Sequence, residues 1–253
     1  MRRLSETITP LRIGTVDVPA RIDRERYFAE LTYLELSALF AGPVKPSVLA
    51  KWAEVAPAKA IGLVAPFPLT HRKPPTGTKL WPHDAASGDF RDSPNGRAAL
   101  AQLKAAIEQL RAGCVVFRSA ESFSPSAANR DQLHRFFGEI ATADLGVTRV
   151  WVPGGLWSVR AAVKLASELG VTCAFDPLVR EPGEPPEVHY DLEAESLYLR
   201  IESASRAGAL RPEKLDELAD LVHSYEDREL TVVFASPERW LDARNFKKLL
   251  DED

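Results

Sequence analysis

The sequence predicts a single α/β domain over residues 1–253, folded as one (β/α)8 barrel of the TIM type. Eight short apolar runs recur along the chain, and most are followed by a segment with apolar residues three and four positions apart, which is the helical period. Strands that alternate with helices build a parallel sheet, and eight such units close into a barrel. A chain of 253 residues that is 45% hydrophobic can bury one core of this size.

The predicted elements follow one another with few interruptions. Pro46 and Pro212 suit the first turn of a helix, Ser158 suits an N-cap, and Gly170 suits the end of a helix before the next strand. The predicted strands are residues 11–15, 32–37, 60–65, 114–119, 148–152, 171–175, 196–202 and 230–235. The clearest helical patterns are residues 46–55, 96–111, 130–140, 158–169, 212–224 and 243–250.

Two segments break the alternation. Residues 70–95 are rich in Pro, Gly, Thr and Asp, and residues 177–195 contain four prolines and many acidic residues. Both are predicted to be long loops, and the second leaves no room for a regular helix between the sixth and seventh strands. Loops of this length are commonly functional or mobile.

Composition excludes several function classes. The net charge of -4 gives no electrostatic basis for a nucleic-acid partner, and no apolar run reaches the roughly 20 residues that span a bilayer. Residues 1–6 carry two arginines without an apolar run behind them, so no signal peptide is predicted. Cys114 and Cys173 lie in apolar runs without CxxC spacing, which indicates buried, reduced thiols. These observations predict a cytoplasmic protein that does not bind a membrane.

The candidate site lies at the carboxyl ends of the strands, where barrels gather their functional groups. Alternation places Glu35 on one face of its strand with Tyr33 and Ser37, while Leu34 and Leu36 lie on the other. The same parity gives polar faces to the fourth and seventh strands. The residues expected at the mouth are Asp17, Glu35, His71, Arg118, Asp176, Arg200 and Glu202.

Two interpretations of these residues stay open. In the first, Arg118 and Arg200 hold a phosphate or carboxylate, Glu35 or His71 transfers a proton as the catalytic group, and Asp17, Asp176 and Glu202 complete the ligand site. In the second, the arginines and glutamates form a charge-compensated network, because unpaired buried charge costs several kcal/mol.

No cofactor or metal is predicted. The five histidines show no HxH or HExxH spacing. Gly154-Gly155 lacks the strand-GxGxxG-helix context of a dinucleotide site and is predicted to make a tight turn at the mouth.

Several short motifs, taken together in their order, resemble the YecE-like family, domain of unknown function 72. The resemblance implies a (β/α) barrel of about this length and covers nearly the whole chain. The motifs that carry it are Ile13-Gly14-Thr15, Leu34-Glu35-Leu36-Ser37 with Phe40, Lys51-Trp52-Ala53-Glu54 with Pro57, Thr70-His71 and Tyr198-Leu199-Arg200.

The chain also departs from that family's pattern. Val64 replaces a Lys, and Trp151 with Pro153 and Gly154 replaces a Glu-x-Arg-His run. Further replacements are Arg118-Ser119-Ala120-Glu121 for Gln-Leu-Pro-Pro, Glu202-Ser203 for His-Gly, and Ala235-Ser236 for paired Asn. The resemblance therefore implies that the family's polar pocket is largely lost, and we expect Trp151 to fill it.

The sequence thus predicts a divergent YecE-like barrel of uncharacterised activity. We expect a non-catalytic or altered protein that binds an unknown protein partner or a small anionic ligand. The alternative is an enzyme, of hydrolase or isomerase type, that acts on a small anionic or sugar-like substrate. A nucleic-acid enzyme would rest on fold analogy alone.

Overall fold

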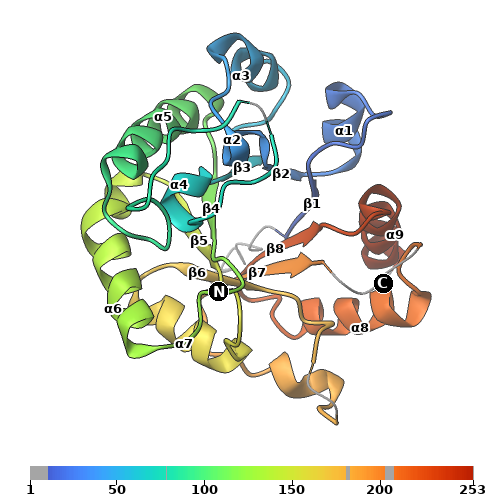
Figure 1. Cartoon of the computed structure of the whole chain (residues 1–253). Coiled ribbons are helices and arrows are strands. Elements are labelled where there is room, and N and C mark those ends of the chain that lie inside the picture. Colours follow the sequence, from blue (N-terminus) through green and yellow to red (C-terminus); the bar gives the residue numbers. More distant parts are fainter. Residues whose placement is uncertain (1–10, 78, 181–182, 203–207, 253) are drawn as a thin grey trace, which may run out of the picture.

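The computed structural model describes residues 11–77, 79–180, 183–202 and 208–252. Eight parallel strands close into a barrel in sequence order, with β1 paired to both β2 and β8 (Figure 1), which confirms the predicted fold class. The strands are β1 (Arg12–Val16), β2 (Tyr33–Leu36), β3 (Ile61–Val64), β4 (Cys114–Arg118), β5 (Thr148–Val152), β6 (Thr172–Phe175), β7 (Ser196–Ile201) and β8 (Glu229–Phe234).

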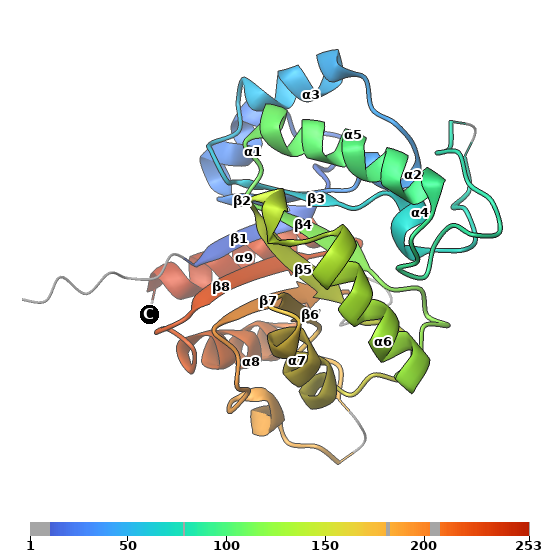
Figure 2. The ribbon, with the colours of Figure 1, turned by 90° about the vertical axis from the view of Figure 1, so that its left-hand side faces the viewer.

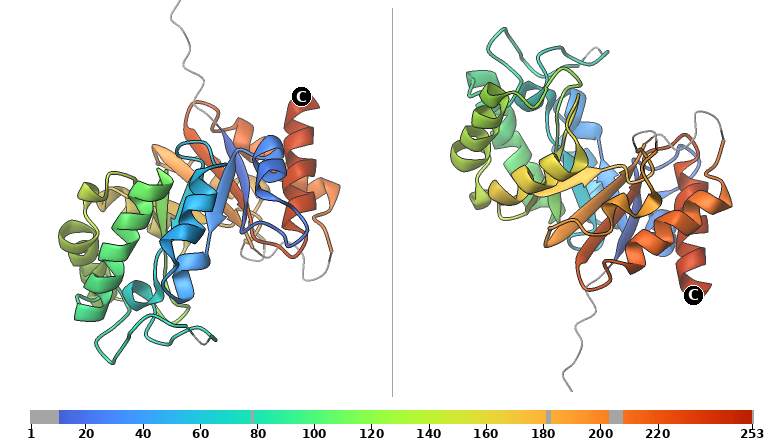
Figure 3. Two further views of the ribbon diagram at one scale, coloured as in Figure 1. Left: turned by 90° about the horizontal axis from the view of Figure 1, so that it is seen from above. Right: turned by 90° about the horizontal axis from the view of Figure 1, so that it is seen from below.

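Helices surround the strands. Seen from the side in Figure 2 and from above in Figure 3, α5 and α6 cover one side of the barrel and α9 covers the opposite side. The helices are α1 (Arg24–Glu30), α2 (Ala38–Ala41), α3 (Pro46–Ala53), α4 (Phe67–Thr70), α5 (Pro94–Leu110), α6 (Ala127–Arg135), α7 (Val159–Glu168), α8 (Pro212–His223) and α9 (Arg239–Glu252). Each of these described helices is too short or too polar to cross a membrane.

Local chemistry explains where the longer helices begin. The Ser93 side chain accepts a hydrogen bond from the Gly96 amide, and Pro94 occupies the first turn, so α5 starts two residues earlier than predicted. The predicted helix over residues 130–140 is divided into α6 and a π-helical turn, Phe136–Ile140. The short helices α1, α2 and α4 were not predicted.

Both predicted loops are largely irregular where the structure describes them. The first begins as α4 ends at Thr70, and it projects from the body of the barrel (Figure 2). In the described part of the second, the one helical segment is a single 3-10 turn, Pro186–His189. Residue 78 of the first loop, residues 181 and 182 of the second, Ser203 and the N-terminal residues 1–10 lie outside the described ranges.

The apolar residues form two cores. The larger lies between the strands and the helices and contains Leu34 and Leu36, whereas Tyr33 belongs to the smaller core inside the barrel. The predicted alternation along β2 is therefore correct. The inner core consists of Tyr33, Cys114, Val116, Val150, Ala174, Tyr198 and Val233.

Two glycines make room for Tyr33 inside the barrel. A Cβ atom on Gly14 would lie 1.9 Å from the Tyr33 carbonyl oxygen, and one on Gly62 would lie 1.8 Å from the Tyr33 hydroxyl oxygen. These strands can approach as closely as they do because both positions lack a side chain. Tyr33 thereby reaches across the barrel toward β7.

Candidate functional site

Glu35 on β2 is a fully buried carboxylate that is held by two side chains of β7. The Tyr198 hydroxyl donates to Glu35 Oε2 (2.7 Å), and Arg200 Nε donates to both carboxylate oxygens (3.1 and 3.2 Å). The Arg200 Nη2 atom also lies 3.1 Å from Glu35 Oε1, and the Arg200 side chain is only 4% exposed. A buried charge persists when it is paired and hydrogen-bonded in this way.

A chain of polar groups continues from Glu35 into the barrel. The Tyr198 hydroxyl lies 3.2 Å from the Tyr33 hydroxyl, which lies 2.9 Å from the Cys114 sulfur. Burial raises the pKa of both tyrosines well above their usual range, with Glu35 adding to the effect, and it raises the pKa of Cys114 to about 12. At neutral pH all three groups are therefore protonated, and Tyr198 can act as a donor to Glu35.

Glu202, at the end of β7, lies outside this buried pair. Its carboxylate forms an ion pair with Arg200 Nη1 and lies 4.0 Å from Nη2 of Arg118, at the end of β4. Arg118 and Glu202 are 37% and 45% exposed, so this part of the network faces solvent. Burial, with the nearby charge of Arg200, lowers the pKa of Arg118, while Glu35 opposes that shift.

His71 follows α4 and lies close enough to Arg118 for that charge to act on its imidazole. Its Nδ1 atom is 2.8 Å from the Thr70 hydroxyl, and its ring packs edge-on against Phe40. Burial lowers the pKa of His71 to about 4, with the charge of Arg118 adding to the shift and Asp89 opposing it. The imidazole is therefore neutral at pH 7.

Two aspartates at the strand ends are bound to backbone. Asp17 accepts from the Ser37 amide (2.8 Å) and from the Ser37 hydroxyl. Asp176 accepts from the amides of Leu178 (3.0 Å) and Glu202 (2.8 Å). Both carboxylates fix the loops that leave the strands.

The structure thus brings Glu35, Arg200, Glu202 and Arg118 into one network, with His71 at its edge. Their roles in catalysis and ligand binding stay predictions. Tyr198 was expected on the same strand face as Arg200 but was not named as a site residue. The alternation of side chains along β7 could have identified Tyr198, because it lies two positions before Arg200 and therefore on the same face of the strand.

Trp151 does not fill the mouth, so that prediction is wrong. Its fully buried ring belongs to the core between the strands and the helices, where its Nε1 atom donates to the Ser119 hydroxyl (2.8 Å). The ring also meets Trp157 edge-on. Val150 and Val152 are the residues of β5 that line the inner core.

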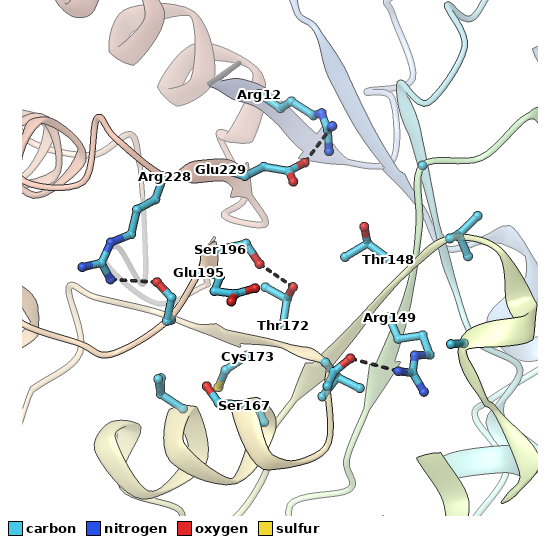
Figure 4. A pocket seen from close by; sticks show the side chains of 18 of the residues that line it. Arg12, Thr148, Arg149, Ser167, Thr172, Cys173, Glu195, Ser196, Arg228 and Glu229 are labelled. Carbon is cyan, nitrogen blue, oxygen red and sulfur yellow. Dashed lines mark hydrogen bonds and ion pairs between the residues drawn. The ribbon is translucent and has the colours of Figure 1, made fainter. Parts of the chain in front are cut away.

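A wide cavity of about 1250 Å³ lies at the opposite end, below the amino-terminal ends of the strands. Figure 4 shows Arg12 paired with Glu229 (2.8 Å) and Thr172 bonded to Ser196 (2.7 Å) at this cavity. Two other arginines there are hydrogen-bonded to backbone. Arg149 donates to the carbonyls of Phe137, Ala141 and Gly170, and Arg228 donates to those of Leu192 and Ala194. This arrangement ties together the loops that enter the strands.

Metal ligands are not grouped in the part of the chain that the structure describes: nowhere in it do three or more His, Cys, Asp or Glu side chains come close enough to hold an ion. The mouth instead offers guanidinium groups, carboxylates and a neutral imidazole. Such groups can bind an anion or move a proton.

Comparison with known proteins gives structural likeness only. No family model matches the chain, and no curated protein matches it. A DUF72 family protein from Thermotoga maritima is similar over 95% of this chain and 99% of its own, with 16% identity and a TM-score of 0.63. A DUF72 family protein from Enterococcus faecalis V583 is similar over 96% of both chains, with 14% identity and a TM-score of 0.66.

A xylose isomerase domain containing protein from Salmonella typhimurium LT2 is also similar, over 96% of this chain and 95% of its own, with 14% identity and a TM-score of 0.57. At these identities the likeness establishes the fold. It supports the resemblance to the YecE-like, or DUF72, family that the sequence motifs indicate.

Proposed function

We propose that this chain is a divergent DUF72-type protein, a single barrel domain over residues 1–253, whose mouth binds a small anion through Arg118. The observation that carries the proposal is the contrast between two arginines. Arg200 is buried and fully engaged by Glu35 and Glu202. Arg118 is 37% exposed, and the carboxylate nearest to it among the paired residues that the structure describes, that of Glu202, is 4.0 Å away. A guanidinium in that position can form a two-pronged contact with an oxyanion.

In this proposal Glu35 stabilises the barrel and does not act on the ligand. It is fully buried, and its oxygens already accept from Tyr198 and Arg200. Glu35 is the buried partner of the Arg200 charge, and removing that partner costs several kcal/mol. The second interpretation of the sequence, a charge-compensated network, therefore describes Glu35 and Arg200.

Anion binding can be measured by NMR titration of the purified protein with acetate and with inorganic phosphate. We expect Arg118→Met to weaken binding by about tenfold or more, since hydrogen bonds to charged groups contribute about 1.5–3 kcal/mol. Arg97→Met is the matched control, because Arg97 on α5 is an exposed arginine that pairs with Asp92 at the surface. Equal binding by wild type and Arg118→Met would reject the proposal.

One observation favours the alternative, an enzyme of hydrolase or isomerase type with a small anionic or sugar-like substrate. His71 places an imidazole at the edge of the proposed anion site, close enough to Arg118 to sense its charge, although the lowered pKa makes that imidazole a weak base. The alternative is supported if purified protein turns over a sugar phosphate or sugar acid and both His71→Gln and Glu35→Gln abolish turnover while circular dichroism shows that each variant is still folded. Retained anion binding without turnover in wild type supports the binding function.

A further inference from the structure

The Glu202 carboxylate lies between guanidinium groups of two strands that are far apart in sequence. It pairs with Arg200 on β7 and lies 4.0 Å from Arg118 on β4. The side chain is 45% exposed, so the place it fills opens directly to solvent. A carboxylate in solution could reach the same place from the barrel mouth.

The backbone of Glu202 is fixed independently of its carboxylate. Its amide donates to Asp176 Oδ2 (2.8 Å). A change in the side-chain torsions alone can therefore turn the carboxylate out to water, and β7 keeps its place. Such rotations of exposed side chains take place in picoseconds to nanoseconds.

The charges show why some carboxylate is needed there. Arg118 and Arg200 are close enough that the charge of Arg200 lowers the pKa of Arg118, after the larger effect of burial. Glu35 neutralises one of the two cations from the buried side. When Glu202 turns away, Arg118, Arg200 and Glu35 together carry a net charge of about +1, which one monovalent anion balances.

We propose that Glu202 occupies the place of a ligand carboxylate, so that the ligand of this mouth is a small carboxylic acid that binds by displacing Glu202. This inference rests on the proposed anion-binding function. A planar carboxylate matches the guanidinium fork that Glu202 now contacts. A phosphate dianion would instead bring one negative charge more than Arg118, Arg200 and Glu35 together balance.

Chemical rescue of Glu202→Ala tests the inference. We expect this variant to unfold at a lower temperature than wild type, because two guanidinium groups then share only Glu35. Added acetate should raise its melting temperature saturably, by a few degrees at about tenfold excess over the Kd, while chloride at equal ionic strength should not. Wild type should respond weakly, because its own carboxylate competes.

Two variants serve as controls. Glu168→Ala removes an exposed carboxylate of α7, and we expect no acetate response beyond that of wild type. The double variant Arg118→Met/Glu202→Ala should lose the response that Glu202→Ala gains. If Glu202→Ala does not fold, Glu202→Gln replaces it, and acetate should then bind at least about tenfold more tightly than to wild type in the NMR titration.

The outcomes separate this inference from the function on which it rests. If wild type binds anions through Arg118 but acetate neither rescues Glu202→Ala nor binds Glu202→Gln more tightly, the displacement inference is wrong and the binding function stands. Phosphate that rescues Glu202→Ala as well as acetate does overturns the carboxylate class. Failure of wild type and both Glu202 variants to bind any anion overturns both.

Discussion

Among the described residues, the side-chain partners of the Glu35 carboxylate come from β7, which is not a neighbour of β2 in the sheet. Tyr198 and Arg200 lie two positions apart on β7, so their side chains point the same way and reach the same carboxylate. The contacts link β2 to β7 through the barrel interior, although these strands are not neighbours in the sheet. The contacts of Glu35 with Tyr198 and Arg200 thus form a tie, that is, a cross-link between β2 and β7.

Tyr198→Phe removes one donor from a buried carboxylate. We expect it to lower the free energy of unfolding by about 1.5–3 kcal/mol, the range for hydrogen bonds to charged groups, as measured by urea denaturation. Tyr33→Phe is the matched comparison, since the Tyr33 hydroxyl is hydrogen-bonded to two neutral groups, the Cys114 thiol and the Tyr198 hydroxyl. Its cost should be smaller, about 0.5–1.5 kcal/mol. Equal costs for the two variants would contradict the assignment of Tyr198 as the donor to Glu35.

His71 should make stability depend on pH. Its folded pKa of about 4 lies below the usual value of 6.5, so the unfolded chain binds the proton more readily. The free energy of unfolding is therefore not reduced by His71 above about pH 6.5. It falls as the pH drops from there toward 4, and His71 causes no further loss at lower pH.

The comparison of wild type with His71→Asn isolates that effect. Between pH 7 and pH 5 wild type should lose about 1–2 kcal/mol more than the variant, measured by urea denaturation at each pH; the two pKa values give about 2 kcal/mol, and the partial exposure of His71 reduces it. His134→Asn, at an exposed position of α6, should behave as wild type does. A pH dependence that is unchanged in His71→Asn would show that the imidazole is not held neutral by the fold.

At the scale of elements, β1, β2 and β3 approach one another where glycine permits it. Gly14→Ala would place a Cβ atom 1.9 Å from the Tyr33 carbonyl oxygen, which is backbone and cannot rotate away. We expect destabilisation of about 3 kcal/mol in urea denaturation. Gly138→Ala is the control, since nothing lies within 4 Å of its added Cβ atom, and its cost should be far smaller. Near-equal costs would mean that β1 can shift away from β2.

The strands were predicted to within one residue at each end, because a run that is buried on both faces stands out in the sequence. The helices α2 and α4 were missed since each has four residues, fewer than two turns, and cannot show a helical period. Trp151 was misplaced for a related reason. Its neighbours Val150 and Val152 are also apolar, so alternation gives no sign of which residues face inward.

The candidate site could be predicted in part. Parity along β2, β4 and β7 placed Glu35, Arg118, Arg200 and Glu202 at the mouth. The sequence could not predict that Tyr198 and Arg200 would both engage Glu35, because those partners are 163 and 165 positions away and depend on how the barrel closes. The sequence also could not show that the Arg118 side chain is partly exposed whereas the Arg200 side chain is buried.

At the scale of the whole molecule, the closed barrel protects both thiols. Cys114 lies in the inner core and Cys173 between the strands and the helices, and burial is the main cause that raises the pKa of each. Only the thiolate reacts, so neither cysteine should react with Ellman's reagent in native buffer, and both should react in urea. The native reaction rate should rise with urea together with the unfolded fraction. Rapid native labelling of one thiol would instead reveal a local opening of the barrel.

The tie between β2 and β7 also limits how such a barrel can change over generations. Loss of Glu35 leaves the buried charge of Arg200 unpaired, and loss of Arg200 leaves the Glu35 carboxylate unpaired. Each loss costs about 3–5 kcal/mol, which is a large part of the stability of a typical domain. Single substitutions in this pair therefore pass through a poorly folded intermediate. A buried pair of this kind is therefore retained for folding, whatever chemistry takes place at the mouth.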